Sequence, residues 1–181
     1  MPSVSQAQEA PVFAITQAGS SIAFNVKASV AIQGTFDNWD ATLTFTSPDV
    51  TTGVLAVKIQ AASVDTGSGF KDSKLKSDDF FAVDQNPLIT FTSTKIVQSG
   101  PNTFEVDGNF TIRGVTRPES LTLAVSGVGT GSGRINGTLY FDRKDYGMNS
   151  GIPFIRIANR VEVNVDLKGT RVSGPPLVFK Q

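Results

Sequence analysis

Apolar and polar residues alternate along most of the chain, in short segments separated by Gly, Ser, Asn and Asp. Residues 21–27 show the pattern clearly, with Ile22, Phe24 and Val26 on one face and polar residues between them. This alternation is typical of a β-strand with one buried face. Similar segments recur at 39–45, 53–61, 88–96, 104–112, 120–126, 134–145 and 157–171. Together they predict roughly eight to ten antiparallel strands at hairpin spacing, in an all-β barrel large enough to hold one ligand.

The alternation stops between Phe70 and Phe91, where charged residues concentrate. One or two helical turns are expected at 71–76, because this charged run has no strand pattern. The apolar residues that follow do not share one helical stripe, so the helix is expected to break near 77–79. Phe80 and Phe81 would then turn inward as a plug. We expect this insertion to close one end of the barrel.

Turn signals divide the strands. The apolar residues change parity between Phe36 and Trp39, which predicts a bulge or turn near residues 37–38. Asn86-Pro87 favours extended backbone before the next strand. The glycine-rich segment 127–133 lies between two strand patterns and is not followed by Lys-Ser or Lys-Thr. It is therefore interpreted as a hairpin turn rather than a phosphate-binding loop.

The 181 residues are enough for one domain with its own core. Residues 1–11 are small and polar, and we expect a loosely attached or disordered segment there, with a single barrel domain over 12–181. Sixteen basic and sixteen acidic residues cancel, so no global field favours nucleic acid. No apolar run approaches the ~20 residues that a membrane-spanning helix needs.

The chain contains neither Cys nor His. Thiol chemistry and a Ser-His-Asp triad are therefore excluded, and catalysis would have to rely on carboxylates, Lys, Arg or Tyr. The acidic residues at 78, 79 and 84 do not have the spacing of a calcium loop. No cofactor and no metal site are expected.

Apolar residues that share the inward register are expected to line one elongated pocket, where Gly108 and Gly137 would leave room for a ligand or for another backbone. Filling of an ordinary core is the alternative for each of them. The candidate ligand-binding residues of this apolar kind are Phe24, Phe36, Trp39, Leu43, Val57, Leu75, Phe80, Phe81, Phe91, Phe110, Leu139 and Phe141.

Arg143 follows Phe141 in the same inward register. Its planar fork of donors could bind a phosphate or a quinone oxygen. The alternative is an internal ion pair with a nearby aspartate, at 142, 145 or 72. Lys71 and Lys74 could also meet an anionic head group, or they could be solvated helix residues.

Three motifs in order carry a resemblance: LKSDDFF (75–81) with NPLITF (86–91), VDGNFTIRGVT (106–116), and FDRKDYGM (141–148). Over residues 12–180 the chain resembles the YceI-like family of lipocalin-like, polyisoprenoid-binding bacterial proteins. The resemblance implies an extended antiparallel barrel with a helical segment near one end, an apolar tunnel for an isoprenoid tail, and a periplasmic or otherwise exported location. Where the family often has Arg-Asp-x-His-Leu, this chain has Lys71-Asp72-Ser73-Lys74-Leu75. The head group could therefore differ from that of relatives.

The leading hypothesis is non-catalytic binding, transport or storage of a long isoprenoid lipid, such as a polyprenyl phosphate or a quinone-like molecule. One alternative is sequestration of other amphiphiles, such as fatty-acid derivatives or hydrophobic drugs. Another is a carboxylate-based lipid-modifying enzyme, and a third is a structural or stress protein whose tunnel is packed shut. The sequence leaves open whether the protein forms a homodimer.

Overall fold

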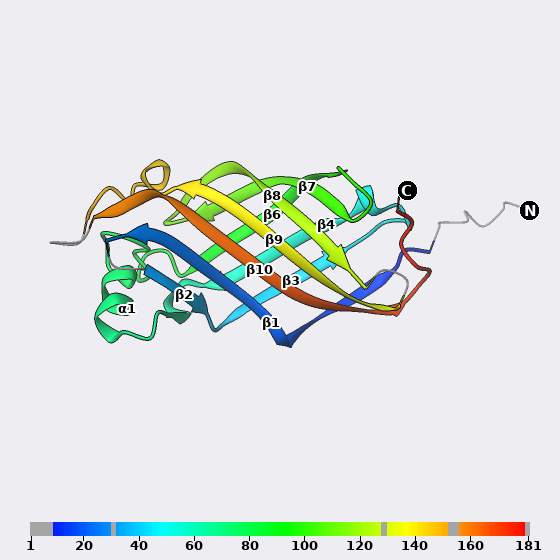
Figure 1. Cartoon of the computed structure of the whole chain (residues 1–181), viewed down its shortest axis with the longest axis horizontal. Coiled ribbons are helices and arrows are strands. Elements are labelled where there is room, and N and C mark those ends of the chain that lie inside the picture. The colour runs from blue at the N-terminus through cyan, green and yellow to red at the C-terminus, as the bar shows by residue number, and fades with distance from the viewer. Residues whose placement is uncertain (1–8, 30–31, 128–129, 152–155, 180–181) are drawn as a thin grey trace, which may run out of the picture.

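A single antiparallel sheet of ten strands forms the protein (Figure 1). The computed structural model describes residues 9–29, 32–127, 130–151 and 156–179. The strands are β1 (Val12–Ala28), β2 (Ile32–Phe36), β3 (Trp39–Thr44), β4 (Val54–Gln60), β5 (Val64–Asp65), β6 (Leu88–Gln98), β7 (Thr103–Ile112), β8 (Val115–Ser126), β9 (Ser132–Asp142) and β10 (Ile157–Ser173). They are hydrogen-bonded in the order β3-β4-β6-β7-β8-β9-β10-β1-β2-β5. The ten strands are at the upper limit of the predicted eight to ten, partly because the short β2 and β5 add to the sheet.

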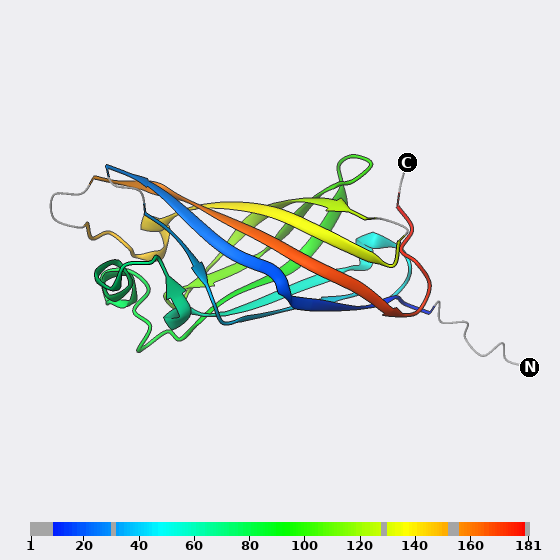
Figure 2. The same cartoon turned by 60° about the horizontal axis from the view of Figure 1, so that its bottom comes forward.

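The sheet curls into an elongated barrel (Figures 1 and 2). Its first edge strand, β3, lies against the N-terminal half of β1, which pairs on its other side with β10. Gln17 Nε2 donates to the Trp39 carbonyl at 2.5 Å across this seam, and the rings of Phe13 and Phe45 meet edge to face at 5.7 Å. Since no strand ladder joins β1 to β3 in the described residues, side chains close the barrel along this line.

Alternation along the strands produces the core. On β7, Phe104, Val106, Gly108, Phe110 and Ile112 are buried, and the residues that alternate with them face outward. Successive strand side chains point to opposite faces, so one face of each strand supplies the barrel interior. The parity change near residues 37–38 is confirmed as the break between β2 and β3. The glycine-rich segment, of which residues 128–129 lie outside the described residues, connects the antiparallel pair β8 and β9 as a hairpin, as predicted.

The interruption of the strand pattern is the helix α1 (Gly69–Lys76), which covers one end of the barrel (Figure 2). It starts two residues earlier than predicted, because Ser68 Oγ accepts a hydrogen bond from the Lys71 amide and caps the first turn. It ends at Lys76, so the predicted break is confirmed. Phe81 is turned inward, with its ring 5.9 Å from that of Phe36.

Asp72 fixes α1 to the segment after β5. Its Oδ1 accepts hydrogen bonds from the Thr66 hydroxyl at 2.6 Å and the Thr66 amide at 2.8 Å. The Thr66 hydroxyl holds the pKa of Asp72 below its usual value. This hydrogen bonding orients the helix over the barrel end.

The first and last described segments of the chain lie at the end of the barrel remote from α1 (Figure 1). Residues 1–8 of the segment expected to be loose lie outside the described residues. Pro11 is buried, and Ala10 packs against Gly174, so the chain is attached to the barrel from about residue 10. Within the described ranges, no helix is long and apolar enough to cross a bilayer.

Candidate ligand-binding site

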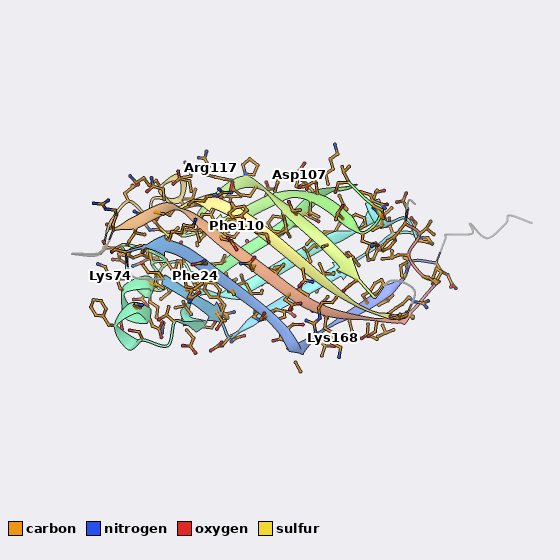
Figure 3. All side chains as sticks on the ribbon, in the orientation of Figure 1. Phe24, Lys74, Asp107, Phe110, Arg117 and Lys168 are labelled. Carbon is orange, nitrogen blue, oxygen red and sulfur yellow. The ribbon has the colours of Figure 1, made fainter. Side chains whose placement is uncertain are left out.

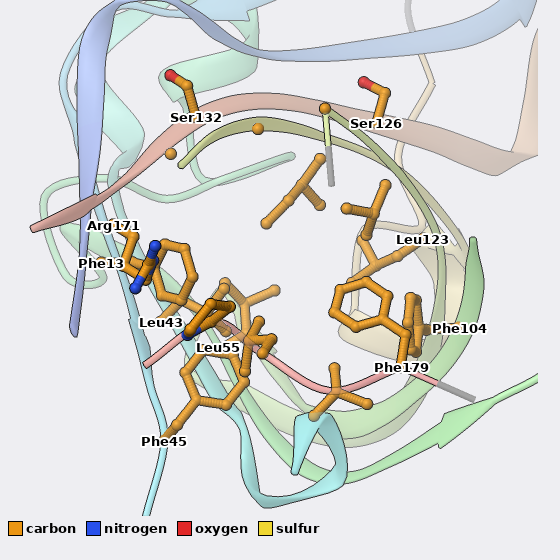
Figure 4. A pocket seen from close by; sticks show the side chains of 18 of the residues that line it. Phe13, Leu43, Phe45, Leu55, Phe104, Leu123, Ser126, Ser132, Arg171 and Phe179 are labelled. Carbon is orange, nitrogen blue, oxygen red and sulfur yellow. The ribbon is translucent and has the colours of Figure 1, made fainter. Parts of the chain in front are cut away.

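A cavity of about 180 Å³ lies inside the barrel at the end remote from α1. Figure 4 shows side chains that line it. Strand residues form most of its wall, the β8–β9 hairpin borders it, and the C-terminal segment covers one side. The residues that line it are Phe13, Ile15, Leu43, Phe45, Val50, Leu55, Ile96, Phe104, Leu123, Val125, Ser126, Gly127, Gly131, Ser132, Gly133, Ile135, Gly169, Arg171, Pro176, Leu177 and Phe179.

The wall of this larger cavity is almost entirely apolar. Three of its lining residues carry polar side chains, and Figure 4 shows the hydroxyls of Ser126 and Ser132 directed away from the cavity. The C-terminal segment is held in place by the Val178 amide, which donates to the Pro48 carbonyl at 2.9 Å. The ring of Phe179 packs edge to face on Phe104 at 5.7 Å. Such a space suits a hydrocarbon group.

A smaller cavity of about 50 Å³ lies at the α1 end. Eight of the predicted ligand-binding residues line it, among them the residues of the aromatic plug: Phe24, Phe36, Leu75, Phe80, Phe81, Phe110, Phe141 and Arg143. Of the predicted set, Leu43 lines the larger cavity. That these residues bind a ligand stays a prediction.

A packed layer separates the two cavities. On β4, Leu55 lines the larger cavity and Ile59 the smaller, while Val57 lies between them. Phe91 pairs with Val57 across the sheet, and Leu139 lies between the two cavities on β9. We call Val57, Phe91 and Leu139 the middle layer; like Trp39, these residues line neither cavity. In the described part of the molecule, the interior thus divides into these separate cavities, where the sequence led us to expect one elongated pocket.

The space beside each of the two glycines is filled by neighbouring protein atoms. A Cβ on Gly108 would lie 2.5 Å from Cζ of Phe91 and 2.6 Å from the backbone oxygen of Thr92, so a ring and another backbone, which was one of the two expected alternatives, occupy that room. A Cβ on Gly137 would lie 2.6 Å from Leu123 Cδ2 and 2.8 Å from Val165 Cγ2. The glycines therefore allow dense packing of the middle of the barrel rather than a wider tunnel.

Arg143 points inward, as its register predicts, and is 6% exposed. Its Nε donates to the Ala158 carbonyl at 3.1 Å, and Nη1 donates to the carbonyls of Met148 and Ser150 at 2.5 and 2.9 Å. No described carboxylate lies within ion-pair distance of it, so the alternative of an aspartate partner is wrong. Arg143 holds the loop after β9 in this structure. Its predicted contact with a head group is untested.

Lys74 forms an ion pair with Asp79 at 2.7 Å. The pKa of Asp79 is lowered by this lysine and by the Ser150 hydroxyl, which donates to Oδ1. Lys74 is thus engaged at the outside of the barrel end rather than directed at either cavity.

A buried polar pair was missed in the sequence. Tyr146 is fully buried against the rings of Phe110 and Phe141, and Glu119 belongs to the inward register of Leu121 and Leu123. In the described structure, Tyr146 Oη and Glu119 Oε2 are buried without a hydrogen bond of normal geometry. Burial raises the pKa of both groups, and Glu119 raises that of Tyr146 further. The alternation along β8, which places Glu119 in phase with Leu121 and Leu123, was the sequence signal that could have predicted its inward direction.

Arg171 was missed as well. It continues the inward register of β10 after Val165, Leu167 and Gly169, and it lines the larger cavity. The same reasoning that selected Arg143 at the end of β9 would have selected it. Among the described residues, no group of three or more acidic side chains is placed to hold a metal ion.

Comparison with known proteins identifies the family and relatives of this chain. The model of the YceI-like domain matches residues 13–169. A UPF0312 protein of Azotobacter vinelandii is 32% identical over 100 residues, which are 55% of this chain and 51% of the relative. The chain thus spans about half the length of that relative.

Two solved structures share the fold. Burkholderia cenocepacia BcnA superposes with a TM-score of 0.77 at 23% identity, over 86% of this chain and 99% of the other. A polyisoprenoid-binding domain from Saccharophagus degradans, described as implicated in plant cell wall breakdown, superposes with a TM-score of 0.67 at 14% identity, over 89% and 99%. With a family model that matches most of its length and a lipocalin-like barrel of the same kind, the chain belongs to the YceI-like family.

Proposed function

We propose that the protein binds an isoprenoid lipid in the barrel interior without chemically changing it, and that the larger cavity receives the tail. The observation that carries the proposal is the apolar cavity of about 180 Å³ lined by the strands and the C-terminal segment. The polyisoprenoid-binding description of the Saccharophagus degradans domain, which shares the fold, supports an isoprenoid as the ligand class. Each buried methylene of a tail contributes about 0.8 kcal/mol.

The cavity volume limits the length of the tail. A protein cavity of about 150 Å³ holds a guest the size of benzene. The larger cavity is therefore large enough for a short isoprenoid segment as it stands. A long tail needs the middle layer to open, which would join the larger cavity to the smaller one beside α1.

Binding without turnover is favoured because the chain has neither His nor Cys. None of the described residues that line the larger cavity carries a carboxylate either. The carboxylate-based enzyme is thus the weaker hypothesis. Sequestration of other amphiphiles would use the same apolar wall of the larger cavity.

We also propose that the protein is exported and that it transports or stores its lipid. The support is the family resemblance. Fractionation of the native host, followed by lipid extraction from the purified protein, tests both parts of this proposal.

Native mass spectrometry of the purified protein, titrated with farnesol, tests the binding itself. A one-to-one adduct is expected, because one cavity receives one tail. Leu123→Trp should abolish the adduct, since an indole would fill the larger cavity that Leu123 lines. Val97→Trp is the matched control: Val97 is exposed on β6, so this variant should keep the adduct. Absence of an adduct with the wild type, or an adduct equally strong with Leu123→Trp, would refute binding in this cavity.

A further inference from the structure

We infer that Arg171 is the head-group anchor of the bound amphiphile and that the head group carries an oxyanion. This inference rests on the proposed function and adds the chemistry of the head group and the orientation of the ligand. Among the described residues that line the larger cavity, Arg171 is the charged one, and its side chain lies beside Phe13 (Figure 4). The head would lie at Arg171, with the tail toward Leu55 and Leu123.

Arg171 is held in place but not neutralised. Its Nη1 donates to the Gly174 carbonyl, and its backbone amide donates to the Gly131 carbonyl at 2.9 Å. In the described part of the molecule, no Asp or Glu lies within ion-pair distance of its guanidinium. Since a guanidinium has five N–H donors, most of them stay available to a ligand.

Arg134 and Arg143 each make more side-chain contacts than Arg171 does. Arg134, at the same end, forms an ion pair with Asp166 at 2.7 Å and donates to the Gly19 carbonyl at 3.0 Å. Arg143 is buried and donates to three backbone carbonyls. Arg171 combines a position on the cavity wall with an uncompensated positive charge.

An oxyanion is the group that this arrangement favours. A positive charge beside an apolar cavity is costly unless an anion meets it, and the planar fork of arginine matches phosphate and carboxylate oxygens. The hydroxyls of Ser126 and Ser132 point away from the cavity, so they do not compete with Arg171 for the head group (Figure 4). The shared chemistry is an anionic head on an apolar tail, as in a prenyl phosphate or an isoprenoid carboxylate.

Isothermal titration calorimetry with three probes tests the assignment: farnesyl phosphate, farnesoic acid and farnesol. Arg171→Gln should weaken binding of farnesyl phosphate by about tenfold to a hundredfold, the loss typical of a hydrogen bond to a charged group. The same substitution should change the affinity for farnesol by no more than about twofold, because farnesol has no charged head group. Comparison of the two anions shows whether phosphate or carboxylate is preferred. Arg134→Gln, which removes an arginine from the same end, should leave all three probes nearly unchanged.

Arg171→Lys keeps the charge but not the fork, and should give an intermediate loss for farnesyl phosphate. If Arg171→Gln fails to fold because it loses the hydrogen bond to the Gly174 carbonyl, Arg171→Lys is the variant that tests the assignment. Equal weakening of farnesol and farnesyl phosphate, or no weakening of either, would overturn the assignment while leaving tail binding intact. If the wild type binds none of the three probes, the proposed function itself fails.

Discussion

Arg143 and Arg171 occupy equivalent places in the strand pattern, each continuing the inward register at the end of a strand. The pattern predicts correctly that Arg143 turns inward. It does not predict hydrogen-bond partners, because those of Arg143 are backbone carbonyls in the loop and strand that follow it. A side chain's direction follows from local parity, whereas its partners depend on how distant backbone folds over it.

Glu119 also points inward because of the alternation along its strand, β8. Its burial leads to a prediction about pH. Burial raises the pKa of Glu119 above its ordinary value near 4.5. A carboxyl whose pKa is higher in the folded protein contributes stability below its unfolded pKa, and that contribution is lost as pH rises through the folded value. Glu119→Gln stays neutral at every pH. Its melting temperature relative to the wild type should therefore increase between pH 4 and pH 8.

Thermal denaturation of both proteins across this pH range is the measurement. A difference in melting temperature that does not change with pH, or that falls as pH rises, would show that Glu119 is not desolvated in the folded protein.

Among the elements, the strands and the helical interruption follow closely from the sequence. Alternation predicted the strands, and the loss of alternation after Phe70 predicted α1 and its end at Lys76. The use of the glycines could not be predicted from the sequence. Gly108 was expected to leave room for a ligand or another backbone, and the room is taken by the backbone of Thr92 and the ring of Phe91, both from the neighbouring strand β6. Sequence parity places both on the inner face but gives no information on which side chain leans over which glycine.

The middle layer leads to a prediction about tail length. Phe91→Leu removes the ring atoms that lie over Gly108 and should loosen the barrier between the two cavities. Affinity for geranylgeraniol should rise severalfold relative to farnesol, because the longer tail gains access to the smaller cavity. Phe104→Leu is the matched control, since Phe104 lines the larger cavity and is not part of the middle layer. Competition binding with the two alcohols measures the ratio.

If Phe91→Leu and Phe104→Leu change the ratio equally, the middle layer does not limit tail length. A lower ratio for Phe91→Leu than for the wild type would mean that long tails follow another route, such as the seam between β1 and β3.

At the scale of the whole molecule, the all-β barrel and its family were predictable from alternation and three motifs, and the family match over residues 13–169 confirms them. The location of the larger cavity was not predictable. It depends on the C-terminal segment, where Leu177 and Phe179 fold back over the barrel end through the contact of Val178 with Pro48. That contact joins residues far apart in the chain, so no local sequence pattern predicts it.

The position of the bound tail tests the central claim most directly. The measurement is a crystal structure of the protein with farnesyl phosphate that carries bromine at the far end of its tail, solved with anomalous data. One bromine peak is expected inside the larger cavity, among Leu55, Phe104 and Leu123, with the phosphate at Arg171. A peak only on the outer surface, or only in the cavity beside α1, would contradict binding of the tail in the larger cavity.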